Sequence, residues 1–151
     1  MNKYITLLLI GVITSLVALH LPTQSKPVSE LETYTTAVYT LNKDVNQHRL
    51  NNGLDPVEID ARLMHSAQDK CEDMQLHGYW SHQRDGKHFA DEILDYGIRS
   101  RVGENLAKDY DYTQATQAWI NSETHNDNLL ADWSIVGYGI CGSKIVQHFA
   151  K

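Results

Sequence analysis

The chain has 151 residues, of which 42% are hydrophobic, 13 are Lys or Arg and 19 are Asp or Glu, so its formal net charge at pH 7 is −6. This acidic balance argues against nucleic acids and anionic membrane surfaces as partners, because binding to either depends on clusters of basic side chains. The apolar fraction is that of a globular protein rather than of a disordered chain, and the length suits one domain with one hydrophobic core.

Residues 1–25 differ from the rest of the chain. Lys3 provides a positive start, and residues 4–21 form an apolar stretch without a formal charge. This pattern is typical of a secretory signal peptide, with cleavage expected before Lys26. Because the stretch is almost long enough to span a bilayer, an uncleaved anchor is the alternative, and it would be the only contact with a membrane. The remaining chain is expected to be secreted, extracellular or periplasmic.

Two helices are expected in the first half of the chain. Residues 26–40 form a lead-in and the start of the first helix, whose apolar positions recur every three or four residues as far as Asn51. The side chain of Asp60 is suited to cap a second helix, which we expect to end before Gly78.

The second half is expected to contain short elements. In chain order they are a loop over residues 79–89, a helix over 90–96, a strand over 98–102 that Gly103 interrupts, a helix over 113–122 with Trp119 inward, and strands over 133–141 and 144–149 joined by Gly142-Ser143. This order implies an α+β fold in which a small antiparallel sheet is covered by helices.

The chain contains two cysteines, Cys71 and Cys141. A pair of cysteines in an exported protein is typical of one disulfide, which here would join the second helix to the terminal hairpin. The alternative is that both are free, buried thiols that act as small apolar side chains.

Three residues at expected element boundaries are candidates for a functional site. His82 follows the end of the second helix, Glu104 lies where the expected strand gives way to a loop, and His125 closes the helix that carries Trp119. Two imidazoles and a carboxylate can hold a divalent metal such as zinc, or act as acid and base near neutral pH. Ser122 would share a helix face with His125, as a nucleophile and its base would. The alternative is that these residues are structural.

Short motifs follow one another in a fixed order from about Leu41 to Phe149. They are Asn46-x-x-Arg49-x-x-x-Gly53-Leu54-x-Pro56, Asp60-x-x-Leu63-x-x-x-Ala67, Asp73-Met74, Gly78-Tyr79-Trp80-Ser81-His82, Gly103-Glu104-Asn105-Leu106-Ala107, Trp119-x-x-Ser122-x-x-His125-x-x-Asn128-Leu129-Leu130, Val136-Gly137-Tyr138-Gly139 and Gln147-x-Phe149. In their order and spacing, these motifs resemble those of the CAP superfamily of cysteine-rich secretory proteins, antigen 5 and plant pathogenesis-related class 1 proteins. The resemblance is closer still to the compact SCP-like extracellular proteins of bacteria, and residues 41–150 are expected to form one such CAP/SCP-like domain.

The resemblance implies an α-β-α sandwich with a concave cleft lined by two histidines and one or two acidic residues. Carried over to this chain, the lining is His82, Glu104 and His125. Larger family members have a second glutamate at the position of Ser122, so the adjacent Glu123 is the candidate for that role. Compact bacterial members usually have Gly-His-Arg around the second histidine, whereas this chain has Thr124-His125-Asn126.

Three functions are compatible with these residues. The favoured one is an exported, non-enzymatic binding domain, for which the resemblance suggests sterols, fatty acids, other small amphiphiles or a cell-surface protein as partners. The second is a zinc site at His82, Glu104 and His125, either structural or hydrolytic. The third is a metal-free hydrolase that uses Glu104, His125 and Ser122, although the sequence has no recognisable oxyanion hole.

Overall fold

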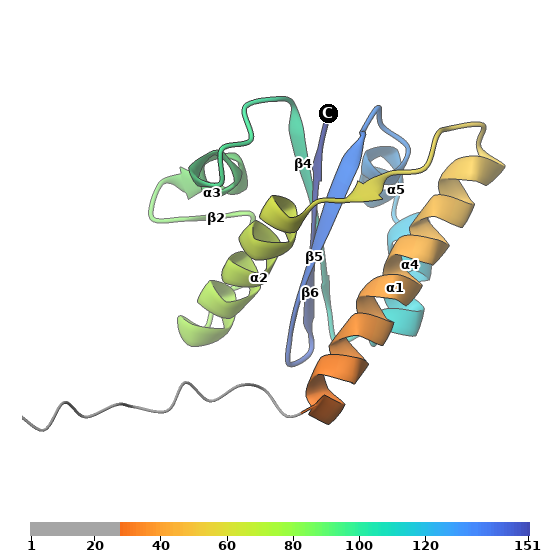
Figure 1. Cartoon of the computed structure of the whole chain (residues 1–151). Coiled ribbons are helices and arrows are strands. Elements are labelled where there is room, and N and C mark those ends of the chain that lie inside the picture. Colours follow the sequence, from red (N-terminus) through yellow and green to blue (C-terminus); the bar gives the residue numbers. More distant parts are fainter. Residues whose placement is uncertain (1–27) are drawn as a thin grey trace, which may run out of the picture.

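The computed structural model describes residues 28–151, so the expected signal peptide or anchor over residues 1–25 lies outside the described residues. Helices on both sides of a central sheet form three layers (Figure 1). In chain order the elements are α1 (Val28–Asn51), β1 (Glu58–Ile59), α2 (Ala61–Leu76), β2 (Gln83–Arg84), β3 (Lys87–His88), α3 (Phe89–Asp95), β4 (Val102–Lys108), α4 (Tyr112–Ile120), α5 (Glu123–Leu129), β5 (Ile135–Cys141) and β6 (Lys144–Ala150).

The central sheet has four strands in the order β1-β5-β6-β4. The strands β5 and β6 form the expected terminal hairpin, and β4 pairs antiparallel with β6. The two-residue strand β1 adds a parallel pairing to β5. The predicted α+β fold with an α-β-α sandwich is confirmed, and the short parallel strand makes the sheet mixed.

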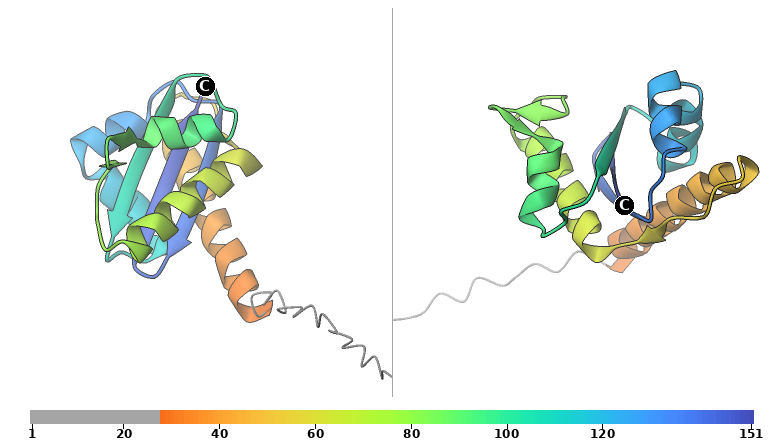
Figure 2. Two further views of the ribbon diagram at one scale, coloured as in Figure 1. Left: turned by 90° about the vertical axis from the view of Figure 1, so that its left-hand side faces the viewer. Right: turned by 90° about the horizontal axis from the view of Figure 1, so that it is seen from above.

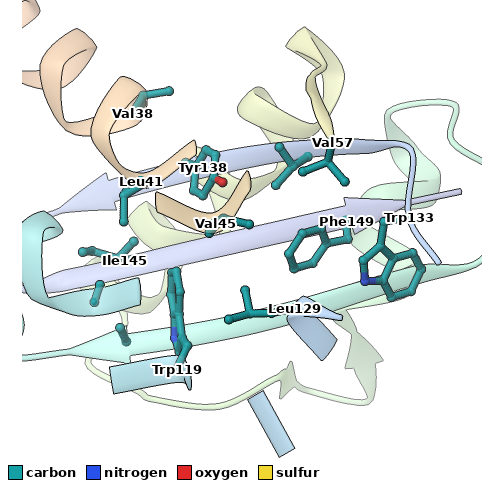
Figure 3. Close-up of a cluster of buried hydrophobic side chains, with 13 residues drawn as sticks. Val38, Leu41, Val45, Val57, Trp119, Leu129, Trp133, Tyr138, Ile145 and Phe149 are labelled. Carbon is teal, nitrogen blue, oxygen red and sulfur yellow. The ribbon is translucent and has the colours of Figure 1, made fainter. Parts of the chain in front are cut away.

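Helices α1, α4 and α5 cover one face of the sheet, and α2 and α3 cover the other (Figures 1 and 2). The side chains of the strands alternate between the two faces, as the pleat of a sheet requires. On β6, for example, Ile145 and Phe149 join the core under α1 and α4, whereas Val146 faces α2. Figure 3 shows the larger core, in which Trp119 of α4 lies over the sheet and Trp133 stacks on Phe149 with ring centroids 5.7 Å apart.

Helix α2 lies very close to the middle of strand β5. Asp60 caps this helix as expected, because its carboxylate accepts a hydrogen bond from the Arg62 N–H at 2.8 Å. A side chain at Gly137 or Gly139 would overlap with the α2 backbone, at Leu63 and Ala67 respectively. The two glycines of the Val136-Gly137-Tyr138-Gly139 motif therefore set the distance between helix and sheet.

The predicted disulfide between Cys71 and Cys141 is confirmed. It joins α2 to the end of β5, with the two Cα atoms 5.9 Å apart across 70 residues of chain. The alternative of two free thiols is wrong, since no described cysteine in residues 28–151 is unpaired.

The expected strand over residues 98–102 is wrong, because the strand in this region, β4, begins at Val102 and continues through Gly103 to Lys108. Glycine commonly ends a strand, but here it makes room for a neighbour. A Cβ at Gly103 would lie 2.6 Å from the Asn128 side-chain oxygen and 2.7 Å from the Trp133 ring. Glu104 consequently lies inside a strand and not at the start of a loop.

Two further elements differ from the expectation. The helix expected over residues 113–122 ends at Ile120, and a separate helix, α5, begins at Glu123, so His125 does not close the helix that carries Trp119. Ser122 is the N-cap residue between the two helices, but its hydroxyl makes no capping hydrogen bond and contacts His125 Nδ1 instead. The loop expected over residues 79–89 contains the two-stranded hairpin β2–β3.

None of the helices formed by residues 28–151 is both long enough and apolar enough to cross a membrane.

Candidate functional site

A pocket of about 380 Å³ opens beside strand β4, at the edge of the sheet. One wall is helix α5, and His82 lies in the segment between α2 and β2; viewed from above, β4 lies between α5 and the β2–β3 hairpin (Figure 2). The predicted residues His82, Glu104 and His125 all line this pocket. The complete lining is His82, Glu104, Asn105, Thr124, His125, Asp127, Asn128 and Ala131.

Glu104 is the buried centre of the site. Its side chain is fully buried, and each carboxylate oxygen is hydrogen-bonded to an imidazole: Oε1 lies 2.6 Å from His82 Nδ1, and Oε2 lies 2.9 Å from His148 Nε2. Burial by itself raises the pKa of Glu104, but it is outweighed by the hydrogen bonds from His148 and His82 and by the positive charge that these rings carry when protonated. The pKa of Glu104 therefore lies below its ordinary value of 4.5, and the carboxylate is ionised at neutral pH.

His148 extends this hydrogen-bond chain into the molecule. It lies on β6 directly opposite Glu104, and both its side chain and that of Glu104 are fully buried. Its second ring nitrogen, Nδ1, lies 2.9 Å from the hydroxyl of Ser66 on α2. The chain Ser66–His148–Glu104–His82 thus runs from α2 through two strands to the pocket.

His82 is the end of this chain that reaches solvent. Its side chain is 49% exposed. Its backbone carbonyl accepts a hydrogen bond from the N–H of Phe89 at 3.0 Å, and the Phe89 ring contacts the His82 ring edge-on with centroids 6.2 Å apart. The start of α3 therefore holds His82 in place, although no regular element contains it.

Two asparagines fix α5 against β4. The side-chain amide of Asn128 donates to the Glu104 carbonyl and to the Asn105 side-chain oxygen, both at 3.0 Å. The Asn105 amide in turn donates to the His125 carbonyl at 3.3 Å. These bonds cap the outer edge of β4 and bring His125 to the pocket.

The His125 ring has one nitrogen, Nδ1, 2.8 Å from the Ser122 hydroxyl. Burial and, second, the positive charge that nearby His82 carries when protonated lower the pKa of His125 below its ordinary value of 6.5, so the imidazole is neutral at pH 7. The predicted Ser122–His125 pair is therefore in hydrogen-bond contact, but Ser122 does not line the pocket. Glu123, the candidate second acid, is exposed on the first turn of α5 and does not line it either.

Each Glu104 oxygen accepts one hydrogen bond from an imidazole, so Glu104 contacts the ring of His82 directly. Within residues 28–151, no group of three or more His, Cys, Asp or Glu side chains is placed to hold a metal ion. Zinc binding stays a prediction from the sequence.

A larger pocket of about 620 Å³ lies between α2, the β2–β3 hairpin and α3. Its charged side chains bind largely to one another: the buried Lys70 ammonium lies 3.1 Å from Glu92 Oε1, and Arg84 pairs with Asp73. This mutual pairing leaves fewer groups free for a ligand. The smaller pocket, with its two imidazoles, is therefore the stronger functional candidate.

His148 and Ser66 are functional candidates that the sequence did not predict. A signal for His148 is visible in retrospect, because it is a histidine in a strand whose other residues on the same face, Val146 and Ala150, are apolar. Ser66 has no such signal, since serine is common on helices. Its role depends on the packing of α2 against β6.

The family model described as the cysteine-rich secretory protein family, CAP, matches residues 43–149. The uncharacterized protein YkwD of Bacillus subtilis is 35% identical over 134 residues, which cover 84% of this chain and 50% of that protein. The uncharacterized membrane protein YlbC of the same organism is 32% identical over 110 residues, 70% of this chain and 32% of that protein. The chain thus spans half or less of the length of these relatives.

Solved structures share the fold at lower identity. An extracellular protein with an SCP domain from Bacillus anthracis superposes with a TM-score of 0.77 at 22% identity, over 85% of this chain and 45% of that one. An outer surface protein of Borrelia burgdorferi gives 0.71 at 19% identity, over 84% and 97% of the two chains. A cysteine-rich secretory protein of Staphylococcus aureus gives 0.70 at 17% identity, over 84% and 41%.

Proposed function

The chain belongs to the cysteine-rich secretory protein (CAP) family, and from that membership and the geometry of its pocket we propose that it is an exported, non-enzymatic binding module. The proposed ligand is a small amphiphile whose polar headgroup enters the pocket at His82, Glu104 and His125. A partner at the cell surface that presents the same kind of polar group is the alternative occupant.

The observation that carries this proposal is the polarity of the pocket. Seven of its eight lining residues are polar, and Ala131 is the exception. Each of the two histidines has one ring nitrogen engaged, His82 with Glu104 and His125 with Ser122, which leaves the other nitrogen for a ligand. Imidazole nitrogens exchange hydrogen bonds readily with hydroxyl groups, so a headgroup that carries hydroxyls suits the pocket.

One feature supports the amphiphilic part of the proposal. Trp80, two residues before His82, is 39% exposed although it is a large apolar side chain. An exposed aromatic ring two residues from a pocket histidine is a candidate surface for the apolar part of a ligand.

Export is supported by the apolar stretch over residues 4–21, by the disulfide and by the extracellular or surface location of proteins that share the fold. Two of the similar structures are an extracellular protein and an outer surface protein. We therefore propose that the domain lies outside the cytoplasm, either released or held by its N-terminal segment.

The proposal is tested with 1-octanoylglycerol, which combines hydroxyls with an apolar chain, by calorimetric titration of the full chain. Glycerol and octanoate serve as the matched ligands that lack one part each. We expect 1-octanoylglycerol to bind more tightly than either, and His82→Ala and His125→Ala to weaken its binding. His65→Ala is the matched control, because His65 is exposed on α2 outside the pocket. Equal binding to all variants, or no binding at all, would contradict the proposal.

The two alternatives, a zinc site and a metal-free hydrolase, predict different results with the same protein and variants. Stoichiometric zinc in protein purified without a His tag, lost in the His82→Ala and His125→Ala double variant, would favour the metal site. Hydrolysis of ester, peptide or glycan substrates that is abolished by Ser122→Ala would favour the serine hydrolase.

A further inference from the structure

The hydrogen-bond chain behind the pocket restricts where its protons can be. Glu104 is ionised, and an ionised carboxylate can only accept hydrogen bonds. The two nitrogens that contact it, His82 Nδ1 at 2.6 Å and His148 Nε2 at 2.9 Å, must therefore both carry a hydrogen. The tautomer of an imidazole is set by the bond that one of its nitrogens makes, so both rings are constrained.

The other end of the chain is consistent with this assignment. An imidazole with its single hydrogen on Nε2 has a lone pair on Nδ1, and in His148 this nitrogen lies 2.9 Å from the Ser66 hydroxyl, which can donate to it. Ser66 is 1% exposed, at the wall of the larger pocket, and His148 is fully buried, so their hydrogen bond is largely shielded from solvent. Every hydrogen-bonding group of the chain has a partner up to His82 Nε2.

We infer that Ser66 and His148 are positioning residues for the pocket: they hold the Glu104 carboxylate so that His82 keeps its hydrogen on Nδ1 and presents Nε2 as an acceptor to the ligand. The ligand group that meets His82 is then a hydrogen-bond donor, such as a hydroxyl, and not a carbonyl or an ether oxygen. The ligand part of this inference rests on the proposed function, whereas the tautomer of His82 does not.

The composition of this face of the sheet supports a role beyond packing. The neighbours of His148 on the same face of β6, Val146 and Ala150, are apolar, and the neighbouring α2 residues Leu63 and Ala67 are apolar as well. A buried polar chain is costlier than an apolar core unless all its members are satisfied. Here each member has a partner, and the chain from Ser66 through His148 and Glu104 ends at the half-exposed imidazole of His82.

The test is nitrogen-15 NMR of the histidine side chains in the full chain at about pH 8, where an ordinary imidazole is neutral. We expect His82 to show a protonated, pyrrole-type Nδ1 and an unprotonated, pyridine-type Nε2. His148→Phe keeps a buried ring but removes the donor to Glu104, and we expect the two His82 signals to move toward the averaged values of a tautomer mixture. His148→Gln supplies an amide N–H in place of the imidazole and should restore the wild-type pattern.

The matched control is Ser122→Ala, which removes the hydroxyl that contacts the other pocket histidine and should leave the His82 signals unchanged. Ser66→Ala is the milder variant if His148→Phe does not fold, and it should shift the His82 signals in the same direction. A wild-type spectrum with the hydrogen of His82 on Nε2 would overturn the inference without any variant. So would a folded His148→Phe, or a folded Ser66→Ala, with the wild-type tautomer.

Titration with 1-octanoylglycerol separates the inference from the proposed function. If both hold, His148→Phe should bind this probe about tenfold more weakly, which corresponds to one hydrogen bond, and His148→Gln should bind it nearly as the wild type does. If the probe does not bind the wild type but the tautomer shifts as expected, the proposed function fails and the positioning role stands. Equal affinity of His148→Phe and wild type would overturn the claim that the positioning residues act on the ligand.

Discussion

Glu104 on β4 and His148 on the neighbouring strand β6 lie directly opposite each other in the sheet, with Glu104 Oε2 2.9 Å from His148 Nε2. This pair gives a buried carboxylate a buried hydrogen-bond donor on one side, and His82 gives it a half-exposed donor on the other. Hydrogen bonds to the charged carboxylate, which are stronger than those between neutral groups, thereby join buried His148 on β6 to the pocket beside β4.

We predict that the folded state loses stability as the pH is lowered from about pH 8 to pH 5, partly through His125. The pKa of folded His125 is lowered, first by burial, to below 6.5, so the unfolded chain takes up this proton first and unfolding is favoured as the pH falls through 6.5. Urea unfolding midpoints across the range test this. In His125→Gln, the part of the decline near 6.5 should become shallower, and an identical profile would contradict the assignment.

Glu104 acts in the same direction at lower pH. Its pKa is lowered below 4.5 because the hydrogen bonds from His148 and His82 outweigh the effect of burial, so its contribution to stability is present above 4.5 and is lost as the pH falls through the folded value. Glu104→Gln should flatten this lower part of the profile, measured by the same unfolding series. A profile that stays steep below 4.5 in that variant would assign the decline to other carboxylates.

Trp119 is expected to be a core anchor. It is 1% exposed, and its indole N–H donates to the Leu106 carbonyl at 3.1 Å, which also caps the edge strand. Trp119→Ala should lower the free energy of unfolding by about 3–5 kcal/mol, as measured by urea denaturation. Trp80→Ala, at an exposed position, is the control and should change it by no more than about 0.5 kcal/mol. Similar losses of unfolding free energy in the two variants would show that Trp119 does not lie on the core-facing side of α4.

The disulfide between Cys71 and Cys141 should stabilise the fold mainly by restricting the unfolded chain. It closes a loop across 70 residues of sequence, for which the chain-entropy model gives about 4 kcal/mol. Reduction of the exported protein should lower its unfolding midpoint accordingly. The unreduced protein should have no free thiol, and a count of two would refute the bridge.

Gly137→Ala should destabilise the domain strongly, because the new methyl group would overlap with the α2 backbone at Leu63. The helix cannot move away from β5 without opening the core, so we expect a loss of about 3 kcal/mol or more in chemical denaturation. Gly142→Ala is the comparison: its nearest neighbour would lie 3.7 Å away, and only its φ of +58° opposes a side chain, which costs about 1–2 kcal/mol. A smaller effect at Gly137 than at Gly142 would mean that α2 packs less closely than described.

The regular elements with strong local patterns were predictable from the sequence. The apolar periodicity of α1, the Asp60 cap of α2 and the turn at Gly142-Ser143 each depend on residues a few positions apart. The same local reasoning failed where a tertiary neighbour decides. Gly103 looks like the end of a strand, but Asn128 and Trp133 occupy the space that its side chain would need.

By itself, the sequence determined the fold class, the cysteine pair and three residues, His82, Glu104 and His125, that line one pocket. Only the tertiary structure decided what those three residues contact. The register of β4 against β6 places His148 opposite Glu104, and the packing of α2 brings Ser66 to His148. These contacts join residues 44 and 82 positions apart in the chain, and hydrogen bonds over such separations depend on strand register and helix packing, which no local pattern encodes.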